Sequence, residues 1–180
     1  MQDGEALKQE GEAEAYEADP VKVNQELVDE IEAGKRMNKM SFSRRGPCLS
    51  GAYDPVTGKT FFGENFDMGS AKGREAFQDF KNNASQVIKD RIAARERAIK
   101  NGEVTPNKSD GTPGAHAEVV AMDKAIKARE AQTEKPVTEA DMGSFDLHNR
   151  SMSNNRPNMP MDRCSNCGAI TNGTTVHGHN

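Results

Sequence analysis

The sequence predicts an α/β fold that contains a β-hairpin, on three observations. Two short apolar runs flank the turn sequence DPVTGK, a pattern that is typical of a hairpin. Several longer segments carry apolar residues at the three- and four-residue spacing of amphipathic helices. The segment GSFDLHNRS alternates weakly between apolar and polar residues, which predicts a further strand. At 180 residues the chain is long enough for one domain of ordinary size with an appendage.

The amino-terminal segment differs in composition from the rest of the chain. Residues 1–34 hold eleven acidic side chains against two basic ones, whereas residues 35–180 carry a net charge of +5. We expect residues 1–19 to be an acidic linker or junction, because they are charged and almost free of large apolar groups. Residues 20–41 are expected to form a helical extension, and residues 42–180 the main domain.

Periodicity and turn signals place the predicted elements along the chain. A spacing of four between apolar residues predicts a helix over about residues 20–37. The hairpin strands are predicted near residues 48–53 and 59–63. Residues 74–101 are predicted to form one long helix, or two helices broken at NNAS. Another helix is expected over about residues 115–131, and the tail TTVHGHN could add a short strand.

Composition excludes some classes of protein. No apolar run approaches the roughly 18 residues that a membrane helix needs, and the amino terminus lacks the order of charges and apolar residues typical of a secretory signal. The hydrophobic fraction of 34% and the mean hydropathy of -0.85 are low for a fully packed globule. Three cysteines, two of them in one C-x-x-C, favour a reducing compartment or a metal over a disulfide framework.

The candidate functional residues lie in two motifs, HAE and C-x-x-C. The turn of a C-x-x-C brings the sulfurs of Cys164 and Cys167 to one side, where both can reach one zinc ion. With His116 as the third ligand, one tetrahedral position would stay open for water, as in catalytic zinc sites. Glu118 lies two residues after His116, so its carboxylate could lie beside that water and transfer protons.

An alternative from the same residues is a structural zinc site. Structural sites normally close with a fourth cysteine or histidine, and His148 as a fourth ligand would favour a binding module without chemistry. Cys48 lies inside a strand signal and is expected to be a small buried hydrophobic residue.

The order of these motifs resembles that of the zinc-dependent nucleobase deaminases, which share H-x-E and P-C-x-x-C signatures. HAEVVAMDKAI and RCSNCGAITNG are most similar to bacterial polymorphic-toxin deaminases of the YwqJ-like group, and SGAYDPVTGKTFFGEN precedes them like the hairpin that begins the family's domain. The likeness covers about residues 42–176. Arg163 departs from the proline of the nucleoside and nucleic-acid editing enzymes, which favours the toxin branch.

The resemblance implies a fold and a set of site residues. The fold is a cytidine deaminase-like three-layer α-β-α sandwich with a central mixed sheet of four to five strands, opened by the hairpin; the short tail favours four. The site would have three zinc ligands, one carboxyl group for proton transfer and two substrate contacts. These are His116, Cys164 and Cys167 for Zn²⁺, Glu118 for proton transfer, and Asn65 and Ala117 for the substrate.

The resemblance also implies a function. The chain would convert cytosine to uracil in nucleic acid, with single-stranded DNA as the favoured substrate and RNA as another. It would be the toxic carboxy-terminal domain of a larger exported bacterial protein and would act in the target-cell cytoplasm. It would be a monomer, and a dedicated immunity protein would neutralise it. No membrane partner is expected. A free cytidine or nucleoside deaminase and a non-catalytic zinc-binding module are the alternatives.

Four basic residues of the predicted helix over residues 74–101 have two readings. They are interpreted first as a solvated helix face and second as contacts to a phosphate backbone. They are Lys89, Arg91, Arg95 and Arg97.

Overall fold

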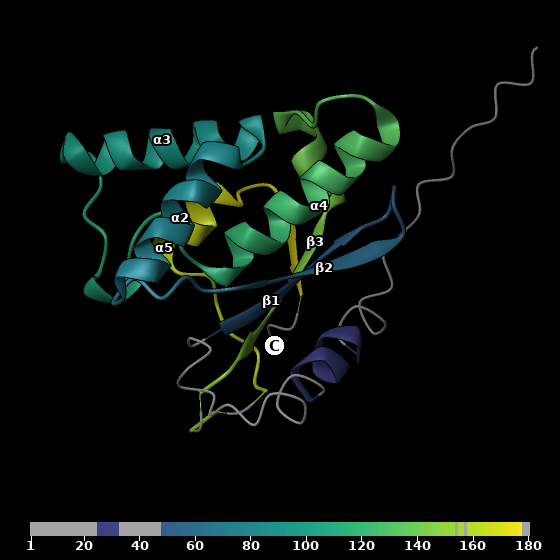
Figure 1. The fold of residues 1–180 in the computed structure, drawn as a ribbon, viewed down its shortest axis with the longest axis horizontal. Helices are drawn as coiled ribbons and strands as arrows, with labels where there is room; N and C mark the ends of the chain where they lie inside the picture. The colour runs from purple at the N-terminus through teal and green to yellow at the C-terminus, as the bar shows by residue number, and fades with distance from the viewer. Residues whose placement is uncertain (1–24, 33–47, 154, 157, 178–180) are drawn as a thin grey trace, which may run out of the picture.

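The computed structural model describes residues 25–32, 48–153, 155–156 and 158–177, which form an α/β fold around one four-stranded sheet (Figure 1). Its strands are β1 (Cys48–Asp54), β2 (Lys59–Glu64), β3 (Asp146–Ser151) and β4 (Thr175–His177). Their order in the sheet is β2-β1-β3-β4. β1 is antiparallel to both β2 and β3, whereas β4 is parallel to β3, so the sheet is mixed.

The predicted hairpin is confirmed, with strand ends within one residue of those expected. Its turn is held by Asp54, whose carboxylate accepts the backbone N–H of Val56 at 3.0 Å and that of Thr57 at 3.2 Å. This is the local bonding by which aspartate favours turns. The strand at GSFDLHNRS and the short tail strand are also confirmed, as β3 and β4.

The helices differ from the predictions mainly at their ends. They are α2 (Ala71–Asn83), α3 (Gln86–Lys100), α4 (Ala117–Thr133) and α5 (Ser165–Ile170), with 3₁₀ turns η2 (Lys108–Asp110) and η3 (Glu139–Ser144). Residues 25–32 are helical, whereas the predicted linker over residues 1–19 and the other residues of the first predicted helix lie outside the described residues. Within the described part of the chain, no helix combines the length and the apolar character that crossing a membrane requires.

Residues 74–101 were predicted to form either one helix or two helices broken at NNAS. The second alternative is confirmed, because α2 ends in this sequence and α3 begins directly after it. The cause of the break lies in another helix. The carboxylate of Asp123 in α4 accepts the backbone N–H of Ser85 at 2.6 Å, and Ser85 is the residue that precedes α3. This bond satisfies a backbone donor at the helix start and fixes the start of α3 against α4.

Helices lie on both faces of the sheet (Figure 1). Side chains alternate between the faces along a strand. Ala52 and Leu147 point to the face where α3, α4 and α5 pack and contribute to the larger core there. Leu49 points to the other face, where it packs against the fully buried Leu27 and Ile31 of the short helix over residues 25–32. Burying each of these leucine or isoleucine side chains stabilises the fold by about 1.5–3 kcal/mol.

α4 lies close to the hairpin at both of its ends. Near its start, a Cβ at Gly63 would be only 2.3 Å from the carbonyl oxygen of Ala117, so this close approach requires glycine. Near its end, Arg129 donates through Nε to Asp54 at 3.0 Å, and its guanidinium lies 3.8 Å from the ring centre of Phe145. These contacts determine where the first turn of α4, which carries the HAE motif, sits over the sheet.

Candidate metal centre

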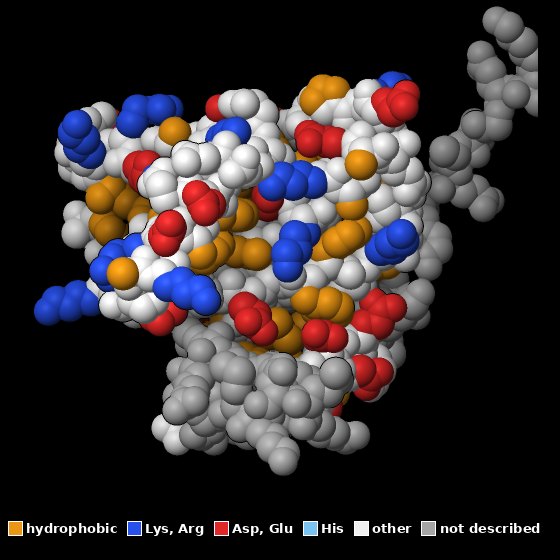
Figure 2. All heavy atoms as spheres, in the orientation of Figure 1, with side chains coloured by type: hydrophobic (Ala, Val, Ile, Leu, Met, Phe, Trp, Pro, Cys, Tyr) orange, Lys and Arg blue, Asp and Glu red, His pale blue; other side chains and the backbone are white. Residues whose placement is uncertain are grey.

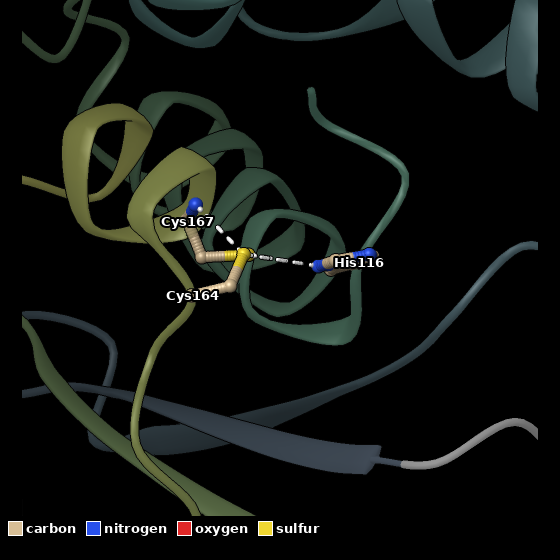
Figure 3. Close-up of side chains that lie close together, drawn as sticks. All are labelled: His116, Cys164 and Cys167. Atoms are coloured by element: carbon tan, nitrogen blue, oxygen red, sulfur yellow. Dashed lines mark hydrogen bonds between the residues drawn. The ribbon is translucent and has the colours of Figure 1, made fainter. Parts of the chain in front are cut away.

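A histidine and two cysteines from distant parts of the chain meet between the starts of α4 and α5 (Figure 3). His116 directly precedes α4, and Cys164 and Cys167 lie at the start of α5. Nδ1 of His116 is 3.3 Å from Sγ of Cys164 and 3.3 Å from Sγ of Cys167. The three ligand atoms all lie within 4.8 Å of one another. The group could therefore hold a metal ion.

The spacing and chemistry of these donors are compatible with zinc. Zinc binds histidine nitrogen at about 2.0–2.1 Å and thiolate sulfur at about 2.3 Å, so a tetrahedral ion separates the two by about 3.5 Å. The observed nitrogen-to-sulfur distances of 3.3 Å are close to that value. One imidazole and two sulfurs also form a donor set that zinc prefers over magnesium or calcium.

Gly111 determines which ring nitrogen of His116 faces the sulfurs. Its φ of 58° lies in the left-handed region, and a Cβ built on it would be 2.8 Å from Nε2 of His116. The backbone of Gly111 therefore lies against the Nε2 side of the ring, and the Nδ1 side faces the two cysteines. A side chain at this position would be strained and would also push the ring.

The two thiols differ in acidity. A hydrogen bond from the Cys167 thiol, with the nearby His116 ring, lowers the pKa of Cys164 to about 4. The backbone N–H of Cys167 also donates to Sγ of Cys164 at 3.4 Å. The pKa of Cys167 is raised by that same bond to Cys164 and by burial. One of the two sulfurs is therefore a thiolate at neutral pH, the form that binds metal.

Glu118 lies in the first turn of α4 and is only 4% exposed. Burial raises the pKa of its carboxyl group, against the lowering effects of its own backbone N–H, of His116 and of a hydrogen bond with Cys167. The carboxyl group is therefore close enough to His116 and Cys167 for both to affect its pKa. The structure thus brings the predicted proton-transfer residue to the predicted ligands.

Asn65 and Ala117 were predicted as substrate contacts, and the structure places them against each other. Oδ1 of Asn65 accepts the backbone N–H of Ala117 at 2.9 Å, and the side chain of Ala117 is fully buried. Asn65 also borders a surface cleft of about 370 Å³, with Phe66 and Lys124 among its other lining residues. A contact between these residues and a substrate stays a prediction.

Four polar residues lie behind the candidate ligands, and none was predicted to support them; Arg95 was considered only as a solvated cation or a phosphate contact. They are Arg95 on α3, Asp110 on η2, and Ser165 and Asn166 at the start of α5. The signal that could have drawn attention to Asp110 is NKSD, in which asparagine and aspartate stand three residues apart, as in a capping box.

Two of the four basic side chains considered for phosphate contacts are used inside the protein. Arg91 donates to the carbonyl oxygens of Ile170 at 2.9 Å and Asn172 at 2.7 Å, and it pairs with Glu139. Arg95 is bonded to the start of α5. On the face shown in Figure 2, basic and acidic side chains are interspersed, without a single basic stripe.

His148 does not join the ligand group. On β1 its paired residue is Gly51, which faces Leu27 of the helix over residues 25–32. Paired residues point to the same face of a sheet, so His148 points toward that helix, away from the face on which α4 and α5 pack. Its ring stacks on that of His177, with 4.9 Å between ring centres. Among the described residues, the group that could hold a metal ion has three protein ligands.

Comparisons of the chain with family models, with curated proteins and with solved structures found no match in any of the three. What these residues do must therefore be inferred from their own geometry and chemistry.

Proposed function

We propose that this chain is a zinc-dependent deaminase that converts cytosine to uracil in nucleic acid, with single-stranded DNA as the favoured substrate. One observation carries the proposal: the buried carboxyl group of Glu118 lies beside the group formed by His116, Cys164 and Cys167. Three protein ligands, with a fourth position for water, are typical of catalytic zinc. A glutamate that does not bind the metal is the proton carrier in hydrolytic nucleobase deamination.

The metal would be held by atoms that already face one another. His116 would bind through Nδ1, because its Nε2 faces Gly111, and both cysteines would bind through sulfur. When bound, zinc supplies Lewis acidity that makes water a good nucleophile near neutral pH. The lowered pKa of Cys164 favours metal binding at that pH, because the thiolate is the ligand.

Glu118 would move the protons of the reaction. Its carboxylate would accept a proton from the attacking water and deliver it to ring nitrogen N3 of cytosine. It would then carry the proton of the new C4 hydroxyl to the amino group, so that the C4–N bond breaks, ammonia leaves and the C4 carbonyl of uracil remains. Because burial raises the pKa of Glu118, the protonated form is easier to reach than for an exposed glutamate, which helps the delivery step. Burial at 4% exposure also keeps bulk water from exchanging that proton.

We further propose that the fold is the cytidine deaminase-like three-layer sandwich. The order of elements supports this: the hairpin comes first, HAE opens the first turn of α4, and the C-x-x-C opens α5 after β3. Four strands also fit the lower number that the resemblance implies. Within that superfamily, we assign the chain to the bacterial polymorphic-toxin branch on the likeness of its two motifs.

The biological setting follows from that assignment. The chain would act as the toxic carboxy-terminal domain of an exported protein, in the cytoplasm of a competing cell, and a dedicated immunity protein would bind it. The net charge of +5 over residues 35–180 is compatible with a nucleic-acid substrate.

The test is uracil formation in a cytosine-containing single-stranded DNA oligonucleotide, with the zinc content of each protein measured in parallel. Glu118→Gln keeps the shape of the side chain and removes its acid–base chemistry. We expect it to retain zinc and to lose activity by about 10²–10⁴-fold. Glu75→Gln, the same change at an exposed position of α2, is the matched control and should behave as the unchanged protein.

The outcomes separate the candidate functions. Activity on RNA or on free cytidine alone would change the substrate and keep the chemistry. Tight zinc binding with no deamination of DNA, RNA or cytidine would refute the enzyme and support a structural zinc module.

A further inference from the structure

We propose that Asp110 is a positioning residue, which sets the distance from His116 to the two cysteines by tying together the segments that carry them. The inference rests on the metal group of the proposed function, but it concerns metal affinity and not deamination.

The ligands need such a tie because they come from separate, short segments. His116 ends the loop after α3, whereas Cys164 caps a helix of only six residues and Cys167 lies within it. His116 and Cys164 are 48 residues apart in the chain. A helix of this length does not hold its place by itself, and metal ligation tolerates errors of only about 0.2 Å.

The carboxylate of Asp110 joins the two segments directly. One oxygen accepts the backbone N–H of Asn107 at 2.7 Å, which closes the turn η2 on the histidine's side. The same oxygen accepts the hydroxyl of Ser165 at 2.6 Å, and the other accepts the backbone N–H of Ser165 at 3.2 Å. Ser165 is the residue next to Cys164, so these hydrogen bonds connect the histidine's loop to within one residue of a candidate ligand.

Main-chain oxygens of the same loop also bond to α5. The side-chain amide of Asn166, which is fully buried, donates to the carbonyl oxygens of Asp110 at 3.2 Å and of Gly111 at 3.1 Å. Gly111 is also the residue that lies against the His116 ring. One buried side chain of α5 therefore holds the backbone that orients the histidine.

Arg95 connects this junction to a long helix. From α3, its Nε donates to Oδ1 of Asn166 at 2.8 Å, and its terminal nitrogen donates to the hydroxyl of Ser165 at 2.9 Å. α3 packs into the larger core through the buried Ile88 and Ile92. The ligand-bearing segments are thus fixed to each other by Asp110 and to the core by Arg95.

The carboxylate form of Asp110 suits this role. Asp110 is 3% exposed, and hydrogen bonds from Ser165 and Asn107 hold its pKa below the usual range. Replacing it by asparagine would turn one acceptor oxygen into an NH₂ group that faces a donor. The substitution Asp110→Asn therefore breaks the tie with almost no change in side-chain volume.

Asp141 offers a matched control. In η3 its carboxylate accepts the backbone N–H of Thr138 at 2.7 Å, in the same capping arrangement that Asp110 makes with Asn107. Within the described part of the chain, Asp141 also accepts the hydroxyl groups of Thr138 and Ser144, and neither bond reaches α5. Asp141→Asn therefore removes an equivalent cap without touching the segments that carry the ligands.

The experiment measures Zn²⁺ affinity of the full chain by competition with a chromophoric chelator, and the absorption spectrum of the Co²⁺ form. We expect Asp110→Asn to weaken Zn²⁺ binding by about 10- to 100-fold, the usual effect of losing a supporting residue behind the ligands. Its Co²⁺ spectrum should change as well. Asp141→Asn should keep both the affinity and the spectrum of the unchanged protein.

Equal Zn²⁺ affinity in Asp110→Asn and the unchanged protein would overturn the inference, as would equal losses in the two variants. If Asp110→Asn does not fold, Ser165→Ala tests the inference in its place, because it removes only the hydroxyl group between Asp110 and Arg95. We expect Ser165→Ala to weaken Zn²⁺ binding by a smaller factor than Asp110→Asn. Unchanged Zn²⁺ affinity in Ser165→Ala would refute the positioning role of Asp110. If the unsubstituted protein binds zinc but forms no uracil, the proposed deaminase activity is refuted and the role of Asp110 is not. If it binds no zinc, both proposals are refuted.

Discussion

The side-chain oxygen of Asn65 accepts a hydrogen bond of 2.9 Å from the backbone N–H of Ala117, the first residue of α4. His116 occupies the capping position of that helix, and its side chain makes no capping bond. Asn65 therefore satisfies one of the free N–H groups at the helix start from outside the helix. The bond links the end of the hairpin to the residue next to His116, a candidate metal ligand.

Asn65→Ala should lower the free energy of unfolding by about 0.5–2 kcal/mol, the range for losing a side-chain cap at a helix start. Asn65→Asp keeps an acceptor oxygen in the same place and should lose less. Urea unfolding of both variants measures the difference. Equal stability of Asn65→Ala and the unchanged protein would show that the bond does not stabilise α4.

Gly111→Ala should weaken zinc binding, because the new methyl group would meet Nε2 of His116 at 2.8 Å. Gly102→Ala is its control: Gly102 has a φ of 72°, and a Cβ there meets nothing within 4 Å. Both variants carry the cost of an L-residue at positive φ, and only the first collides with a ligand. Chelator competition should therefore show weaker Zn²⁺ binding for Gly111→Ala alone; a similar loss in Gly102→Ala would assign the effect to backbone strain.

Arg129→Met should be among the most destabilising single substitutions outside the site. Arg129 is 6% exposed and Asp54 is fully buried, so the variant leaves a buried carboxylate without its cation. Breaking a buried pair in this way costs about 3–5 kcal/mol. Lys81→Met removes the partly exposed pair with Glu96 and should cost no more than about 1 kcal/mol. Thermal unfolding compares them, and equal losses would contradict the buried pair's role.

The contribution of Asp141 to stability should depend on pH. Hydrogen bonds from the backbone and hydroxyl of Thr138 lower its pKa from the ordinary 3.8. A carboxyl group whose pKa is lower in the folded chain stabilises the fold above the unfolded value and loses that contribution as the pH falls through the folded value. Asp141→Asn should therefore be less stable than the unchanged protein at pH 7, and the gap should close below about pH 4. Urea unfolding across this range would show a constant gap if the interaction were not ionic.

The hairpin was predictable because its determinants are local. Asp54 bonds to residues two and three positions later, so a few neighbouring letters contain the whole turn. The start of α4 was expected two residues too early, because the bond that marks it comes from Asn65, 52 residues away. Whether α2 and α3 were one helix stayed open for the same reason, since Asp123 reaches Ser85 from α4.

The candidate metal ligands could be predicted from their residue types, whereas the residues that hold them in place could not. Histidine, two cysteines and a glutamate have chemistry that restricts what they can do together. Arg95 looked like one more cation on a solvated helix face, and Asp110 like part of a polar loop. Their partners on α5 lie 55 to 71 residues away along the chain, so periodicity and turn patterns could not indicate that these two residues support the candidate ligands.

β3 lies in the chain between His116 and the two cysteines, and it pairs with β1 in the centre of the sheet. That non-local pairing brings the segments that carry His116 and the two cysteines toward one another, and pairings between distant segments form slowly. Metal capture would therefore be among the last events of refolding, and the rate of zinc uptake by the refolding chain would report the closure of the central strands.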